Sequence, residues 1–70
     1  MPIVFAPENT NLRITKVLLD EKTKRHLENL GILVNSNVSI ISKSNGDVII
    51  KVKDGRVSIN RETAIKIFVA

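Results

Sequence analysis

The feature that most constrains this chain is a single short helix that ends at a glycine and leads directly into strand-forming sequence. Asp20 is a good N-cap for a helix over residues 21–30, and Gly31 can adopt the left-handed conformation that ends a helix. The predicted inward face consists of three residues at helical spacing, Thr23, Leu27 and Leu30. The sequence after Gly31 is typical of short strands joined by glycine turns. A chain of 70 residues has room for one small core, so we expect one helix among many strands.

The composition indicates one small domain of cytoplasmic type. Residues 1–70 contain no linker, repeat or low-complexity segment, which predicts a single domain. There is no cysteine for a disulfide or a thiolate metal site, and no apolar run approaches the roughly 20 residues of a membrane-spanning helix. A net charge of +4 favours an acidic partner or surface, although in a small domain it is most often a solvated surface.

The strand before the helix carries an irregularity. Leu12 and Ile14 alternate with polar residues, but the apolar phase then shifts by one residue to Val17 and Leu19. Such a shift predicts a bulge or bend in this strand.

Ser44-Asn45-Gly46 is a strong hairpin signal between the next two strands. A three-residue loop pairs Val38 with Val52, Ile40 with Ile50, and Ser42 with Val48. A two-residue loop at Asn45-Gly46 would instead set Ile40 against Lys51. We therefore expect the three-residue loop, because it keeps the aliphatic residues together on one face.

Asp54-Gly55 predicts a second hairpin. A two-residue turn there pairs Val52 with Val57, Ile50 with Ile59, and Lys53 with Arg56. Both hairpins together place seven aliphatic residues on one core face, namely Val38, Ile40, Val48, Ile50, Val52, Val57 and Ile59. Three strands thus agree on a single core.

The end of the chain closes the predicted fold. Asn60 can cap a short helical turn near residues 61–65, and Ile67–Val69 forms a last strand that pairs with the first. Closure removes exposed strand edges. We therefore predict a mainly β fold, a small antiparallel barrel with one inserted helix.

Four segments of the chain carry a family resemblance, namely Arg13–Val17, Arg25–Ile32, Val38–Ile41 and Arg56–Val69. They resemble the FeoA family, ferrous iron transport protein A, over nearly the whole chain. The resemblance implies an SH3-like barrel with an inserted helix, in agreement with the strands predicted above. It also implies a small cytosolic accessory protein of bacterial ferrous iron uptake, whose partner is FeoB, the membrane transporter with a cytosolic GTPase domain.

Two positions depart from the family pattern. Asn9 stands where a glycine is usual before the first strand, and Val34-Asn35 stands where the family usually has Pro-Gly. Asparagine is the non-glycine residue that best tolerates positive φ, so we expect the fold to survive both changes.

The residues indicate neither catalysis nor a bound cofactor. His26 is the one histidine, and carboxylates such as Glu28 or Asp20 would not share a helix face with it, so no metal site is predicted. We expect His26 to be a half-exposed packing or partner-contact residue. No serine has a triad-like setting, and the three glycines are isolated, so neither a nucleophilic enzyme nor a phosphate-binding loop is expected.

Two groups of polar residues, both rich in cations, are candidates for partner binding. Lys51 and Lys53 point outward from the second hairpin, which is the pattern of a solvated face or of contact with an acidic partner or the inner membrane leaflet. On the helix, the residues predicted to face a partner are Lys24, Arg25, His26 and Asn29. Cations near a helix start are locally unfavourable, which favours a role other than helix stability.

Ile41 and Ile49 form a predicted outward pair on the face away from the core. We expect the helix or the N-terminal segment Ile3–Phe5 to cover them. If they stay open, they are candidates for partner contact or self-association.

Two functions follow from this reading. The first is an accessory protein that binds FeoB and meets the membrane only through that partner. The alternative is a basic SH3-like regulatory module that binds nucleic acid or senses metal, related to the C-terminal domain of iron-dependent repressors. The near absence of aromatic residues and the lack of a helix-turn-helix argue against nucleic acid.

Overall fold

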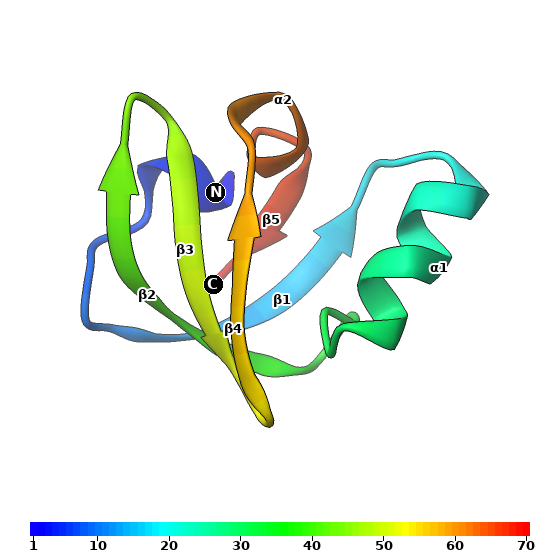
Figure 1. Cartoon of the computed structure of the whole chain (residues 1–70), viewed down its shortest axis with the longest axis horizontal. Helices are drawn as coiled ribbons and strands as arrows, with labels where there is room; N and C mark the ends of the chain where they lie inside the picture. The colour runs from blue at the N-terminus through cyan, green and yellow to red at the C-terminus, as the bar shows by residue number, and fades with distance from the viewer.

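The fold is a strongly curved antiparallel sheet of five strands with one helix standing beside it (Figure 1). A computed structural model describes all residues, 1–70. The strands are β1 (Asn11–Val17), β2 (Asn37–Ser44), β3 (Asp47–Val52), β4 (Gly55–Ile59) and β5 (Ile67–Val69). The helices are η1 (Ile3–Phe5, a 3-10 helix), α1 (Glu21–Asn29) and α2 (Arg61–Ala64). The five antiparallel strands and the inserted helix confirm the predicted SH3-like fold. In the order β4-β3-β2-β1-β5 the strands β4 and β5 do not pair with each other, so the predicted closure that removes strand edges is wrong.

The turn between β2 and β3 has two residues, Asn45 and Gly46, so the predicted three-residue loop is wrong. Ser44 lies directly opposite Asp47, and the turn residues have φ of 54° and 89°. Positive φ at both positions is what a type I′ turn requires, and Asn-Gly is its preferred sequence. The local turn chemistry therefore decided the loop length.

A β-bulge in β2 then restores the aliphatic pairing. The observed partners are Ile40 with Ile50, Ser42 with Ile49, and Lys43 with Val48. Ile41 is thus inserted into β2 without a partner of its own, as in other bulges. The predicted pairing of Ile40 with Ile50 is confirmed, whereas the predicted pairing of Ser42 with Val48 is wrong because the shorter turn moves the strand by one residue.

The β3–β4 turn lies one residue earlier than predicted, at Lys53-Asp54. Val52 is opposite Gly55, which stands at the fourth turn position, where type I turns favour glycine. The observed partners are Lys51 with Arg56, Ile50 with Val57, and Val48 with Ile59. The predicted partners Val52–Val57, Ile50–Ile59 and Lys53–Arg56 are therefore wrong. Moving the turn by one residue moves each partner by two, so every side chain keeps its predicted face.

The core consists entirely of apolar side chains, and no polar residue is buried. Of the seven residues predicted for the core face, six are buried and Val57 is half-buried. The remaining buried residues are Ile3, Ala6, Leu12, Ile14, Leu27, Ile32, Ala64, Ile67 and Val69. Side chains from every strand and helix thus meet in one cluster, which supports the prediction of one core.

The first and last strands meet as predicted, and β1 is irregular where the apolar phase shifts. β1 pairs with β5, and its register shifts between Ile14 and Lys16. The N-terminal residues extend this pairing, because the Val69 N–H donates to the Met1 carbonyl at 2.8 Å. In α2, the Asn60 side chain accepts a hydrogen bond from the Thr63 N–H at 3.0 Å, which confirms the predicted cap.

Helix α1 begins as predicted but buries a different residue at its end. Leu27 is buried, whereas Leu30 is 40% exposed, so its predicted inward position is wrong. The helix ends at Asn29, and Gly31 follows with a φ of 98°. This left-handed residue redirects the chain, and Ile32, only 1% exposed, fills the inner position that Leu30 was expected to take.

Asparagine occupies two left-handed positions, as expected. Asn9 has a φ of 60° and Asn35 has a φ of 75°. Arg13 donates from Nη1 to the Asn35 Oδ1 at 3.0 Å, so the second asparagine also ties its loop to β1.

The hairpin turn gives the first prediction. A Cβ at Gly46 would lie 2.6 Å from Cδ of Arg61, and the φ of 89° is unfavourable for alanine. Gly46→Ala should therefore lower the free energy of unfolding by about 2 kcal/mol, the usual size of such backbone strain. Chemical denaturation measures the loss.

Asn45→Gly is the matched control in the same turn. It keeps the positive φ without adding a side chain, so its unfolding free energy should stay within about 0.5 kcal/mol of the parent. Equal stability of Gly46→Ala and the parent would contradict the assigned turn.

The cap of α1 gives a pH prediction. Two hydrogen bonds from Thr23 lower the pKa of the Asp20 carboxyl below its ordinary 3.8. The larger effect comes from the Thr23 side chain and the smaller one from its backbone N–H. A lowered folded-state pKa means that the stabilisation is complete above pH 3.8 and disappears as the pH falls through the folded value. Asp20→Asn keeps a capping oxygen without a titrating group, so its melting temperature should fall less than that of the parent on acidification in this range. Parallel acid unfolding curves for the two proteins would contradict this assignment.

A candidate partner-binding surface

Helix α1 stands on one side of the barrel (Figure 1), and its exposed side chains are polar. Arg25, His26 and Asn29 are exposed, and Lys24 is half-buried. The outward placement of the first three agrees with the prediction, although His26 is more exposed than expected. Three exposed polar side chains alone do not distinguish a binding face from ordinary surface.

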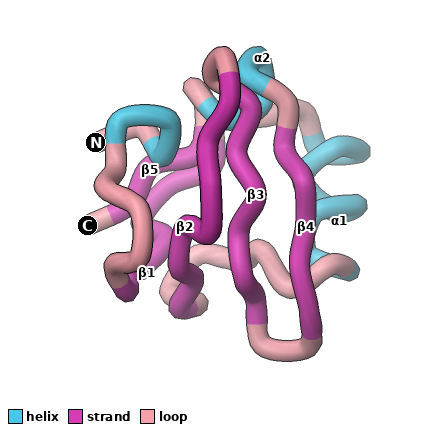
Figure 2. Tube along the Cα trace, turned by 60° about the vertical axis from the view of Figure 1, so that its left-hand side comes forward, coloured by secondary structure: helices cyan, strands magenta, loops and turns pink.

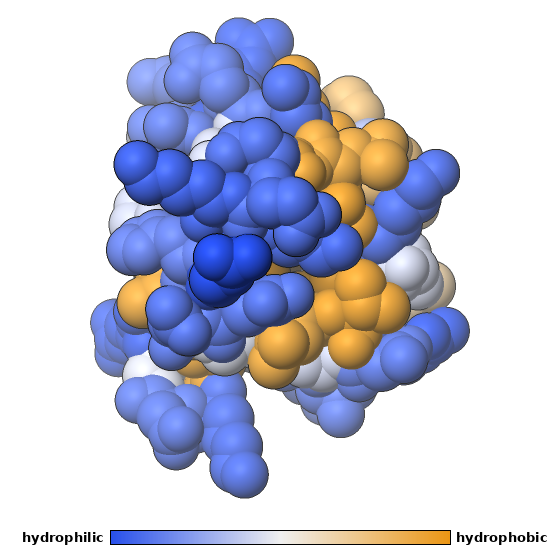
Figure 3. Space-filling model, turned by 90° about the vertical axis from the view of Figure 1, so that its right-hand side faces the viewer, coloured by the Kyte–Doolittle hydropathy of each residue, from blue (hydrophilic) through white to orange (hydrophobic).

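Exposed apolar side chains lie in the loops before and after this helix, and we call them the apolar strip. Its members, with their exposed fractions, are Leu18 (50%), Leu30 (40%), Leu33 (43%) and Val34 (44%). Figure 3 shows two neighbouring groups of apolar surface on the side of the molecule that carries α1, bordered by hydrophilic side chains. An apolar centre with a polar border is the usual anatomy of a protein interface.

Hydrogen bonds hold the two loops of the apolar strip in place. The Leu18 N–H donates to the Lys66 carbonyl at 2.9 Å, which ties the loop before α1 to the start of β5. In the loop after α1, the Asn35 N–H donates to the Ile14 carbonyl at 2.7 Å. The Ser36 hydroxyl donates to the Leu33 carbonyl at 2.6 Å and accepts from the Leu33 N–H. The exposed side chains therefore project from fixed backbone, which lowers the entropy lost on binding.

Three members of the apolar strip were not predicted from the sequence, and the fourth, Leu30, was predicted to face inward. A signal was present in the consecutive apolar residues Leu18-Leu19 and Ile32-Leu33-Val34. Neighbouring residues of an extended chain point to opposite sides, so such runs cannot all face one core. Reading those runs for outward residues would have predicted the strip.

The predicted pair Ile41 and Ile49 lies elsewhere, on the outer face of the sheet. The bulge sets Ser42 opposite Ile49, so the two isoleucines are not direct partners. Ile41 is half-buried and Ile49 is 38% exposed, so the expected cover is incomplete. The N-terminal helix η1 packs against α2 and β5, and the N-terminal segment also reaches β2, where Lys43 Nζ donates to the Ala6 carbonyl at 2.6 Å.

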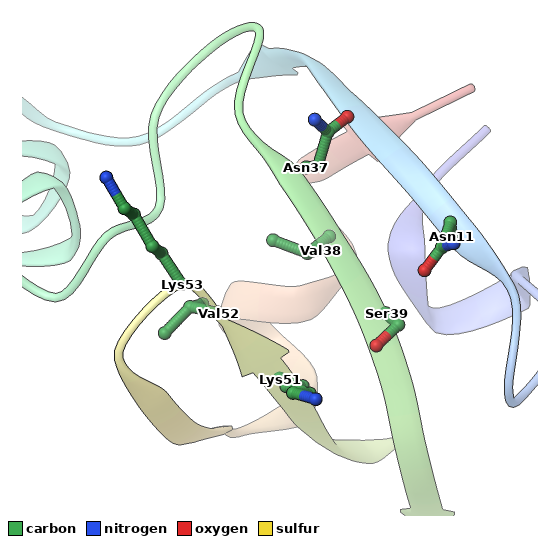
Figure 4. A pocket seen from close by; sticks show the side chains of 7 residues that line it. All are labelled: Asn11, Asn37, Val38, Ser39, Lys51, Val52 and Lys53. Carbon is green, nitrogen blue, oxygen red and sulfur yellow. The ribbon is translucent and has the colours of Figure 1, made fainter.

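Lys51 and Lys53 are exposed and border a shallow, open depression of about 250 Å³ between β1, β2 and β3 (Figure 4). The structure thus divides the eight predicted contact residues between two surfaces, the face of α1 and the outer face of the sheet. No three His, Asp or Glu side chains come together in an arrangement that could hold a metal ion. None of the helices is long and apolar enough to cross a membrane.

These features define the chain as a small SH3-like barrel with an inserted helix and an apolar surface beside it. The model of the FeoA domain family matches residues 1–70. A relative from Methanocaldococcus jannaschii, named "Putative Fe(2+) transport protein A", is 32% identical over 68 residues, which are 97% of this chain and 83% of the relative. The chain belongs to the FeoA family.

Solved structures of the family have the same fold. A crystal structure named "Iron Uptake Regulatory Protein (FeoA)" superposes with a TM-score of 0.87 at 17% identity, covering 99% of this chain and 93% of the other. The solution structure of a FeoA protein from Chlorobium tepidum gives a TM-score of 0.88 at 15% identity, covering 99% and 68%. At these identities the likeness concerns the fold alone. The predicted family and fold are confirmed.

Proposed function

We propose that this chain is a non-catalytic accessory protein of ferrous iron uptake, which acts in the cytoplasm by binding the GTPase domain of a FeoB-type membrane transporter. Membership of the FeoA family and the name of the archaeal relative support the link to Fe(2+) transport. The apolar strip beside α1 is the observation that carries the mode of action, because it is a fixed apolar surface that the barrel itself does not use.

The apolar strip supplies the centre of the proposed contact. Fully burying the side chain of a leucine contributes about 1.5–3 kcal/mol to the free energy of binding. The leucines of the apolar strip are 40–50% exposed in the free chain, so burying the rest of each side chain contributes roughly half of that. Leu30 and Leu33 lie together at the end of α1 and are the proposed anchors. Arg25, His26 and Asn29 border them as a polar rim, where they affect orientation and association rate more than affinity.

The binding test compares the parent with Leu30→Ser and Leu33→Ser variants against a purified FeoB cytosolic domain. Each variant should weaken binding about fivefold to tenfold in calorimetry, because burying the exposed part of one such leucine contributes roughly 1 kcal/mol to the free energy of binding. Both residues are exposed in the free chain, so the melting temperature should change little.

Phe5→Ser is the matched control for the binding test. Phe5 is 72% exposed on η1, away from α1 (Figure 1), and its replacement also removes one large apolar side chain. Its affinity should equal that of the parent. Unchanged binding by the Leu30 and Leu33 variants would contradict the proposed site, and a change in oligomeric state without loss of binding would reassign the apolar strip to self-association.

A cellular measurement tests the proposed role independently of the contact residues. Deleting the gene for this chain in cells that still express the transporter should lower the accumulation of ferrous iron. Restoring the parent chain should restore uptake, whereas the double variant Leu30→Ser/Leu33→Ser should restore it poorly. Unchanged uptake after deletion would contradict the accessory role.

A further inference from the structure

The outer face of the sheet carries a concentrated positive charge that the proposed contact beside α1 does not use. Strand register places one residue from each of four strands in a single row across this face, namely Asn11, Ser39, Lys51 and Arg56. A second row beside it contains Arg13 and Asn37, and Lys53 follows at the end of β3. We call these seven residues the basic face.

The basic face holds most of the chain's net charge. It contains four cations, and the acidic side chain of the adjoining turn is Asp54. This surface therefore carries three of the four net positive charges. The other acidic residues lie at α1, α2, the N-terminal loop and the far end of β3. Figure 2 shows β2, β3 and β4 side by side, so the charge spreads over one continuous sheet surface.

This arrangement of charge is unfavourable within the free chain. Lys51 lies directly opposite Arg56, and like charges in that position destabilise a sheet. All four cations are exposed, and their side chains reach solvent from a rigid ladder of strands. An external anion would remove the repulsion between them.

The depression on the basic face has the groups that bind phosphate oxygens. The side chains of Asn11, Ser39 and Lys51 follow one another across three strands, and Asn37 lies above them (Figure 4). Amide, hydroxyl and ammonium groups all donate hydrogen bonds to phosphate. The depression is shallow and open, which suits a group presented on a surface better than an enclosed small molecule.

We propose that the basic face binds the anionic phosphate headgroups of a lipid bilayer. Protein interfaces are built around apolar or aromatic anchors and contain few lysines. The seven residues of the basic face are polar or cationic, and the two valines that line its depression, Val38 and Val52, are buried. Ile49, which is 38% exposed, is an apolar neighbour on the same face of β3, so exposed polar and cationic side chains outnumber apolar ones on this surface. A lipid surface instead presents mobile headgroups to cations spread over one face of a domain, and each cation strengthens binding about fivefold (~1 kcal/mol). The chain would then approach the membrane directly, and not only through a partner.

Co-sedimentation with vesicles tests this proposal. The parent chain should bind vesicles that contain phosphatidylglycerol in phosphatidylcholine, and the binding should fall as salt screens the charges. Vesicles of phosphatidylcholine alone should not bind it. Equal binding to both compositions would overturn the proposal.

Two double variants with the same net charge separate the basic face from overall charge. Lys51→Glu/Arg56→Glu reverses two cations of the basic face, while Lys16→Glu/Lys22→Glu reverses two exposed cations on β1 and α1. The first variant keeps a like-charged pair across β3 and β4, so a similar melting temperature is expected. Lys51→Glu/Arg56→Glu should weaken vesicle binding at least tenfold, and the control should change it less than threefold.

The remaining outcomes also decide the question. Equal losses in both double variants would overturn the proposal in favour of non-specific attraction. Tighter binding to a polyglutamate peptide or to duplex DNA than to the anionic vesicles would overturn it in favour of an acidic protein or a nucleic acid. The result does not depend on FeoB, so failure here leaves the proposed accessory role intact.

Discussion

The pairing of Ile40 with Ile50 across β2 and β3 is the constraint on which the rest of this fold depends. The Asn45-Gly46 sequence demands a two-residue turn, which would set Ile40 against a lysine in a regular hairpin. The bulge at Ile41 resolves the conflict by inserting one residue into β2. Both the preferred turn and the aliphatic core are then satisfied, and the outward side chains of β3 project from the opposite face.

The predictable part of the fold rests on alternation and on capping residues. Alternation assigned the core face correctly even though both turns were predicted wrongly. The β3–β4 partners moved by two residues, which leaves side chains on the same face, whereas the β2–β3 pairing moved by one residue and the bulge at Ile41 restored the aliphatic pairing. The caps Asp20 and Asn60 were predictable from local chemistry, whereas the positive φ of Asn35 was expected from the family resemblance. The bulge was not, since the preferred Asn-Gly turn and the aliphatic pairing conflict in a regular hairpin, and the sequence alone does not show that an inserted residue satisfies both.

The candidate surfaces were harder to predict than the core. Leu30 fits a helical stripe in the sequence, but the helix ends one residue earlier and leaves it 40% exposed. The apolar strip and the basic face have different origins in this fold. The strip arises where loops around α1 contain more apolar residues than the small core can bury, and the basic face arises where strand alternation directs polar residues outward.

The central claim is that the apolar strip beside α1 is the surface through which this FeoA-family chain meets its partner. Mapping of backbone amide shifts by NMR, on the labelled chain titrated with a FeoB cytosolic domain, tests it most directly. The account predicts the largest shifts at Leu18, Leu30, Leu33 and Val34, with little change along β3. Shifts confined to the outer face of the sheet, or no shifts at all, would contradict it.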